Sequence, residues 1–111
     1  MSKLEFNSNN QPTIGIELEL GLVDANTFNL SNSVRQMLDI LPEDESQCFK
    51  PELMQIFLEI NTCVCNDVGE AEADLRKKIT TREQAADQLG VQLWWRSTHP
   101  FTHWQGQQVT P

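Results

Sequence analysis

Two glutamates near the start of the chain have the residue type and the spacing to support chemistry. Glu17 and Glu19 alternate with apolar residues in the stretch IGIELEL, residues 14–20. Because successive side chains of a strand point to opposite faces, both carboxylates would share one face, about 6–7 Å apart. Two like charges held side by side repel each other. The stretch therefore predicts either a solvated outer face of an amphipathic strand or a face directed at a bound cation.

A second pair of glutamates occurs in another extended segment, residues 48–62. Glu59 interrupts an apolar run that is typical of an inner strand of a covered sheet, where an unpaired carboxylate is costly. Glu52 precedes Glu59 by seven residues. On a regular strand this odd spacing directs the two side chains to opposite faces, so a shared site requires a bend between them, which Pro51 favours. Without that bend, Glu52 is an ordinary surface acid.

The four glutamates together predict a magnesium site. Mg²⁺ takes oxygen ligands and commonly bridges carboxylates to substrate phosphates. Strand-borne glutamates that open into one cavity would suit a metal–nucleotide complex. The predicted metal ligands are Glu17, Glu19, Glu52 and Glu59.

Other residues with chemical potential give weaker signals. His99, beside Pro100, could bind a metal or contact a phosphate, or it could be a hydrogen-bonded structural imidazole. The three tryptophans, at positions 94, 95 and 104, are predicted to fill the core or an interface, because no basic residues interleave them. Cys63 and Cys65 are separated by one residue where zinc pairs usually have two, so both are interpreted as packing residues. The sequence shows no nucleophile–base pair and no glycine-rich phosphate loop.

The elements that must position these residues follow from periodicity. Strands are predicted over residues 13–23, 28–30, 48–62 and 91–96, and helices from about residue 33 to 41 and over 67–89. This order predicts an α+β fold with a mostly antiparallel sheet and helices on one face. Residues 1–12 are polar and are predicted to be a flexible lead-in, and residues 13–111 are predicted to form part of one catalytic domain.

Composition narrows the classes of partner. The 111 residues have a formal net charge of −8, which argues against a nucleic-acid partner because no basic patch is present to neutralise phosphates. A nucleotide bound together with a divalent metal stays compatible with this charge. No apolar run is long enough to cross a membrane, and the amino terminus lacks the apolar core of a signal peptide. Three cysteines without a disulfide-like pattern predict reduced thiols in a cytoplasmic protein.

Three blocks of this sequence resemble the type 2 glutamate–cysteine ligase family, which comprises carboxylate–amine ligases of bacteria. The stretch TIGIELELGLVD, residues 13–24, resembles the opening of that family. The second block is similar from PEL, residues 51–53, through LEINTCVC, residues 58–65. The third comprises THPF, residues 98–101, together with Trp104. All three blocks occur in the order that the family has, so the resemblance covers nearly the whole chain.

The resemblance implies a fold similar to that of glutamine synthetase, with ATP and Mg²⁺ as cofactors. It implies phosphorylation of an amino acid's carboxylate, typically the γ-carboxylate of glutamate, followed by attack of an amine such as that of cysteine. The partners would then be a small-molecule amino acid and an amine. The four glutamates match the family's magnesium-binding glutamates, and His99 lies in a segment near the nucleotide.

The chain also departs from the family pattern. Ser97 stands where the family usually has glycine, and family members are several times longer. We therefore expect an amino-terminal fragment that is inactive by itself. An exposed sheet edge would favour self-association into a homo-oligomer. Two other functions remain open on the sequence: a non-catalytic module that binds itself or another subunit, and a different metal-dependent enzyme such as a hydrolase.

Overall fold

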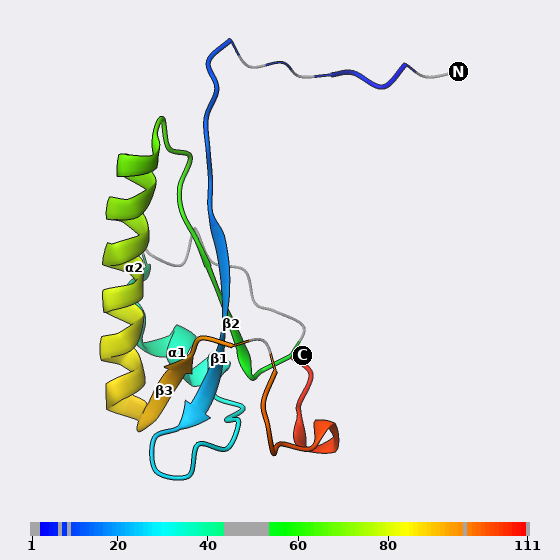
Figure 1. Ribbon diagram of the computed structural model, residues 1–111, viewed down its shortest axis with the longest axis vertical. Helices are drawn as coiled ribbons and strands as arrows, with labels where there is room; N and C mark the ends of the chain where they lie inside the picture. The colour runs from blue at the N-terminus through cyan, green and yellow to red at the C-terminus, as the bar shows by residue number, and fades with distance from the viewer. Residues whose placement is uncertain (1–2, 7, 9, 44–53, 97, 111) are drawn as a thin grey trace.

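The computed structural model describes residues 3–6, 8, 10–43, 54–96 and 98–110, which form a small sheet with helices packed against it (Figure 1). The elements, in chain order, are β1 (Glu17–Asp24), α1 (Val34–Ile40), β2 (Phe57–Asn61), α2 (Val68–Leu89), β3 (Val91–Trp94) and the 3₁₀ helix η2 (Trp104–Gly106). The strands form one antiparallel sheet in the order β2-β1-β3, so β1 lies in the centre. The predicted α+β class is confirmed.

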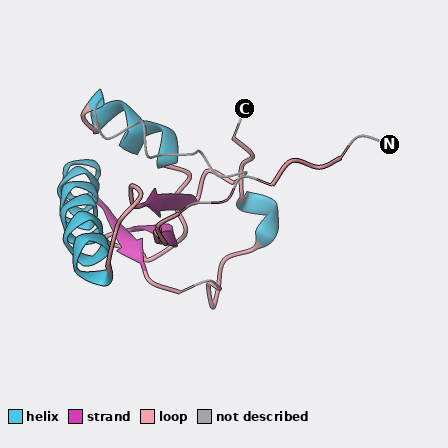
Figure 2. Cartoon of the chain, turned by 90° about the horizontal axis from the view of Figure 1, so that it is seen from above, coloured by secondary structure: helices cyan, strands magenta, loops and turns pink. Residues whose placement is uncertain are grey.

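The hydrophobic core lies between one face of this sheet and the two α-helices. The alternation of β1 directs Leu18, Leu20 and Leu22 to that face, where they meet Leu58 and Ile60 of β2. Seen from above, both α-helices lie on the same side of the sheet (Figure 2). The buried core residues are Leu20, Leu22, Val34, Met37, Leu41, Leu58, Ile60, Ala85, Ala86 and Val91.

Helix α2 has the terminal signals that its sequence predicts. The Asp67 carboxylate accepts a hydrogen bond from the backbone N–H of Glu70 at 2.8 Å, which caps the first turn. Gly90 ends the helix in the left-handed conformation, with φ of 68°. Arg82, which interrupts the apolar stripe in the sequence, is fully buried and donates a hydrogen bond to the carbonyl of Lys78. Within the described ranges, neither helix has the length and apolar character that a membrane span requires.

The predicted strands are longer than the observed ones. Strand β1 begins at Glu17 because the N–H of Ile16 bonds the hydroxyl of Thr62, at 2.8 Å, instead of a ladder carbonyl. The predicted short strand at residues 28–30 is a single bridge between Leu30 and Val23. Strand β2, predicted to be an inner strand, is an edge strand of the sheet that the described residues form.

Two packing predictions are wrong in part. Trp95, which follows the last residue of β3, and Trp104, which lies in η2, are 56% and 75% exposed and so do not fill the core. The alternative that they fill an interface stays a prediction. Cys65 is buried, as predicted, but Cys63 is exposed. The Cys63 residue follows the end of β2, and its Sγ atom lies 3.6 Å from Nζ of Lys78.

The carboxyl-terminal residues 98–110 lie on the other side of the sheet from α2 (Figures 1 and 2). They are held by the segments that precede α1 and β2. The N–H of Gln55 donates to the carbonyl of Gln108 at 2.8 Å, and the N–H of Gln108 donates to Oδ1 of Asn32 at 3.0 Å. This arrangement brings residues 98–107 beside the face of the sheet that α1 and α2 do not cover.

Candidate functional site

The face of the sheet opposite the core displays the predicted acidic residues. Glu19 of β1 lies directly across from Glu59 of β2, and Glu17 lies directly across from Asn61. Side chains at directly opposed positions of an antiparallel pair share one face. We call this set, Glu17, Glu19, Glu59 and Asn61, the acidic face.

The backbone hydrogen bonds on either side of Glu19 and Glu59 show which kind of opposed pair these two residues form. The N–H of Thr62 donates to the carbonyl of Ile16 at 2.9 Å, and the N–H of Leu22 donates to the carbonyl of Ile56 at 2.8 Å. Hydrogen-bonded and non-hydrogen-bonded pairs alternate along two antiparallel strands. Because Glu19 and Glu59 lie an odd number of residues from both flanking bonds, they form a non-hydrogen-bonded pair, in which opposed Cα atoms approach to about 4.5 Å. Like charges in this position destabilise a sheet, so strand stability does not account for the pair.

The members of the acidic face differ in burial. Glu17 and Glu19 are exposed, whereas Glu59 is only 9% exposed. Oε1 of Glu59 accepts a hydrogen bond from Nδ2 of Asn61 at 2.6 Å. A buried carboxylate requires such donors, because burial removes its hydration. Asn61 therefore holds the Glu59 side chain on this face.

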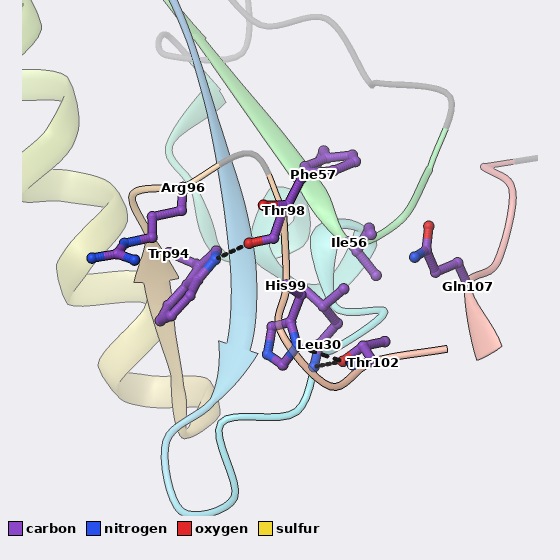
Figure 3. A pocket seen from close by; sticks show the side chains of 9 residues that line it. All are labelled: Leu30, Ile56, Phe57, Trp94, Arg96, Thr98, His99, Thr102 and Gln107. Atoms are coloured by element: carbon purple, nitrogen blue, oxygen red, sulfur yellow. Dashed lines mark hydrogen bonds between the residues drawn. The ribbon is translucent and has the colours of Figure 1, made fainter. Parts of the chain in front are cut away.

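A pocket of about 260 Å³ lies between the sheet and residues 98–107 (Figure 3). Phe57 and Trp94 both lie directly across from Gly21, two residues along β1 from Glu19, so their side chains share the acidic face. The residues that line the pocket are Leu30, Ile56, Phe57, Trp94, Arg96, Thr98, His99, Thr102 and Gln107. The aromatic walls of the pocket thus lie on the same face of the sheet as Glu19 and Glu59.

Gly21 determines where the Trp94 ring lies. A Cβ atom added at Gly21 would approach Cβ and Cδ1 of Trp94 to 3.2 and 3.3 Å, which is closer than ordinary van der Waals contact. The indole Nε1 donates to the carbonyl of Thr98 at 3.3 Å (Figure 3). The absent side chain at position 21 therefore lets Trp94 lie close over β1 and form one wall of the pocket.

His99, the predicted cofactor-binding residue, lines this pocket and is held by backbone groups. Its Nδ1 atom accepts hydrogen bonds from the N–H groups of Phe101 and Thr102, at 3.3 and 3.2 Å. Its Nε2 atom contacts the carbonyl of Phe28, and because a carbonyl only accepts, Nε2 has the proton. Both ring nitrogens thus make hydrogen bonds in this conformation. The ring also packs edge-to-face against Phe101, with 4.3 Å between the ring centroids. Its role toward a cofactor stays a prediction.

The structure brings together three of the four predicted metal ligands on one face, Glu17, Glu19 and Glu59. Glu52 lies outside the described residues. Within the part of the chain that is described, no group of three histidine, cysteine or acidic side chains is arranged to hold a metal ion. The donor set nevertheless suits Mg²⁺, because it consists of oxygen atoms with negative charge. The opposed pair, Glu19 and Glu59, is the part that fits a cation best.

The sequence-based predictions missed three residues that support this site: Asn61, Lys78 and Asp74. Nζ of Lys78 donates to the backbone carbonyl of Asn61 at 2.8 Å and pairs with Oδ2 of Asp74 at 2.9 Å. Burial would raise the pKa of Asp74, but hydrogen bonds from Lys78 and from the Cys63 N–H, with the charge of Lys78, lower it below its ordinary value. For Asn61 a signal existed, because it follows Glu59 by two residues.

Comparison with known proteins identifies the family of this chain. The sequence profile of glutamate-cysteine ligase family 2 matches residues 13–111. Similar curated proteins include three named "Putative glutamate--cysteine ligase 2". The one from Thermobifida fusca is 35% identical over 97% of this chain and 28% of its own length. The one from Gloeobacter violaceus is 34% identical over 96% of this chain and 29% of its own length.

The third, from Janthinobacterium, is 37% identical over 97% of this chain and 30% of its own length. The chain thus spans less than a third of the length of these relatives. The profile match covers the acidic residues of β1 and β2 as well as residues 98–110 beside the pocket. On this evidence, the chain belongs to glutamate–cysteine ligase family 2.

Proposed function

We propose that this chain forms the amino-terminal part of an ATP- and Mg²⁺-dependent carboxylate–amine ligase with a fold like that of glutamine synthetase. The observation that supports the proposal most is the direct opposition of Glu19 and Glu59 on the acidic face, next to an aromatic pocket. Membership of the family and the names of the relatives support the class of reaction. The acid substrate would be an amino acid, glutamate being the first to test, and the amine would be that of cysteine.

The reaction has two steps that need no protein nucleophile. An oxygen of the substrate carboxylate attacks the γ-phosphorus of ATP and ADP leaves. The amine then attacks the acyl carbon and the C–O bond to the phosphoryl group breaks, so phosphate leaves with the former carboxylate oxygen. The amine nitrogen gives up a proton, to solvent or to the departing phosphate, as the amide bond forms. Bound Mg²⁺ would offset the negative charge of the phosphoryl group during transfer.

The chain's own residues contribute position and charge. Glu17, Glu19 and Glu59, with Glu52, would hold the metal ions through carboxylate oxygens. Phe57 and Trp94 would exclude water from the adjoining pocket. His99 would orient the loop that lines the pocket, because three backbone groups bind its ring nitrogens. Since the chain spans less than a third of its relatives, we propose that it is inactive alone and acts as part of a cytoplasmic enzyme.

The first test is a titration of the full-length protein with Mn²⁺, in which binding is measured by electron paramagnetic resonance. Glu19→Gln and Glu59→Gln should each weaken binding about ten-fold or more, because each removes one charged ligand. Glu83→Gln is the matched control, since Glu83 is exposed on α2, away from the acidic face. Equal affinity in all four proteins would contradict the metal site.

The second test addresses the reaction itself. With glutamate, ATP and Mg²⁺, the full-length protein should release ADP, and added hydroxylamine should trap the activated carboxylate as a hydroxamate. ADP release without dependence on an amino acid would favour a different ATP-consuming enzyme. Turnover without ATP would favour a hydrolase.

A further inference from the structure

Asn61 is the neutral member of the acidic face. It follows Glu59 by two residues on β2, so both side chains lie on the same face, and it lies directly across from Glu17. A carboxylate therefore neighbours Asn61 along its own strand and another lies opposite it. The side-chain amide is placed where it can affect both.

One half of the Asn61 amide orients the Glu59 carboxylate. Nδ2 donates to Oε1 of Glu59 at 2.6 Å, a short distance for a hydrogen bond to a charged acceptor. This direction is the one that charge requires, because the opposite orientation of the amide would place its oxygen against a carboxylate. The bond restricts the rotation of a side chain that is 9% exposed.

The other half of the amide is an unused acceptor. Oδ1 of Asn61 is buried and has no hydrogen-bond partner within the described residues. Buried acceptors are normally satisfied, so an unsatisfied one beside a functional site calls for an explanation. A neutral oxygen among carboxylates suits a hydrated cation, either as a ligand or as the acceptor for a ligand water.

The backbone of Asn61 is also held in place. Nζ of Lys78, from α2, donates to the carbonyl of Asn61 at 2.8 Å and to Oδ2 of Asp74 at 2.9 Å. The same Oδ2 atom accepts from the N–H of Cys63 at 2.8 Å. Lys78 is 5% exposed, so this contact is shielded from solvent. The end of β2 is thus attached to the helix layer at the residue whose side chain reaches Glu59.

We propose that Asn61 is a positioning residue of the metal site. Its Nδ2 group fixes the Glu59 carboxylate in the orientation that binds a divalent cation, and its Oδ1 atom is the neutral acceptor of that site. This inference rests on the proposed function, since it requires that the acidic face binds metal. It extends the predicted ligand set, which contains glutamates only, by an amide.

The test is Mn²⁺ affinity measured together with thermal unfolding in the full-length protein. Asn61→Ala should weaken Mn²⁺ binding ten- to hundred-fold, the range found when a residue that orients a metal ligand is removed. Its melting temperature without metal should also fall, because the buried Glu59 carboxylate loses a hydrogen-bond donor, so affinity is measured well below that temperature. Asn26→Ala is the matched control, because Asn26 is exposed in the turn after β1.

Including Glu19→Gln in the same series separates the two proposals. If Glu19→Gln weakens binding while Asn61→Ala binds Mn²⁺ as the wild-type protein does, the role of Asn61 is overturned and the metal site stands. If the wild-type protein binds no Mn²⁺, or Glu19→Gln has no effect, the metal site is overturned and the role of Asn61 with it. A lower melting temperature with unchanged affinity would show a structural role only.

A second measurement needs no folded Asn61→Ala variant. The side-chain amide resonances of Asn61 in a ¹⁵N NMR spectrum can be assigned by their absence in Asn61→Asp. Addition of Mg²⁺ should shift these resonances in the wild-type protein, because the amide contacts both the ligand carboxylate and the ion's surroundings. Unshifted Asn61 resonances, in a spectrum where other resonances of the acidic face move, would overturn the proposal.

Discussion

The two faces of the β2-β1-β3 sheet differ in the kind of side chain that the strands place opposite one another. On the face toward the helices, Leu20 lies directly across from Leu58, and both are almost completely buried. One residue further along the same two strands, Glu19 lies directly across from Glu59. The backbone geometry is shared, so the difference lies only in the side chains.

This difference separates what stabilises the fold from what opposes it. Burial of the leucine pair stabilises the folded state, by about 25 cal/mol for each Å² of apolar surface. Repulsion between the neighbouring carboxylates of the glutamate pair destabilises the folded state. The metal ion proposed above would offset the charge of the acidic face.

The largest expected effect of a substitution lies on the helix-covered face. Leu58→Ala should lower the free energy of unfolding by about 2–5 kcal/mol, because it removes a fully buried side chain and leaves a cavity. Chemical denaturation followed by circular dichroism measures this change. A loss below about 1 kcal/mol would show that the described core is not the stabilising one.

A smaller effect is expected where the helix layer holds the end of β2. Asp74→Asn should lower stability by about 1.5–3 kcal/mol at neutral pH, because it removes the charged partner of Lys78. The pKa of Asp74 is lower in the folded state than its ordinary value of 3.8. Its ionised form therefore stabilises the fold above about pH 4, and this contribution is lost as the pH falls below that value.

Unfolding measured between pH 7 and pH 2 separates this contribution from others. The variant should lose less stability on acidification than the wild-type protein does. Part of the acid dependence should remain in the variant, because hydrogen bonds from the N–H groups of Thr27 and Asn26 also lower the pKa of Asp24. Identical acid dependence in both proteins would contradict the role of Asp74.

The smallest expected effect has the opposite sign and lies on the acidic face. Glu19→Gln should raise stability by about 0.2–1 kcal/mol without divalent ions, because it relieves repulsion with Glu59. With saturating Mg²⁺ the order should reverse, since ligand binding stabilises the wild-type protein. Denaturation with and without Mg²⁺ provides the comparison. A wild-type protein that is more stable without metal would mean that the pair does not repel.

The sequence predicted the local part of this arrangement well. Alternation in IGIELEL placed Glu17 and Glu19 on one face, and terminal signals placed the bounds of α2 within one residue. These features depend on neighbours in the chain, which periodicity and capping report directly.

The long-range part was not accessible in the same way. The opposition of Glu19 and Glu59 depends on the register between strands about 40 residues apart in the chain, and a slip by one residue would turn one strand's acids to the helices. The backbone contacts of His99 depend on a loop whose path no periodicity describes. The exposure of Trp95 and Trp104 depends on where β3 ends and where η2 forms.

The glycine beneath Trp94 has a consequence for how this protein can change over evolutionary time. Every amino-acid replacement of Gly21 adds at least a Cβ atom, and that atom would lie 3.2 Å from Cβ of Trp94 and 3.3 Å from Cδ1 of its ring. No intermediate in size exists between glycine and alanine, so even the smallest change at position 21 requires Trp94 to move by a few tenths of an ångström. Substitutions at position 21 are therefore coupled to Trp94, since a change that moves or replaces this tryptophan would make room for a side chain there.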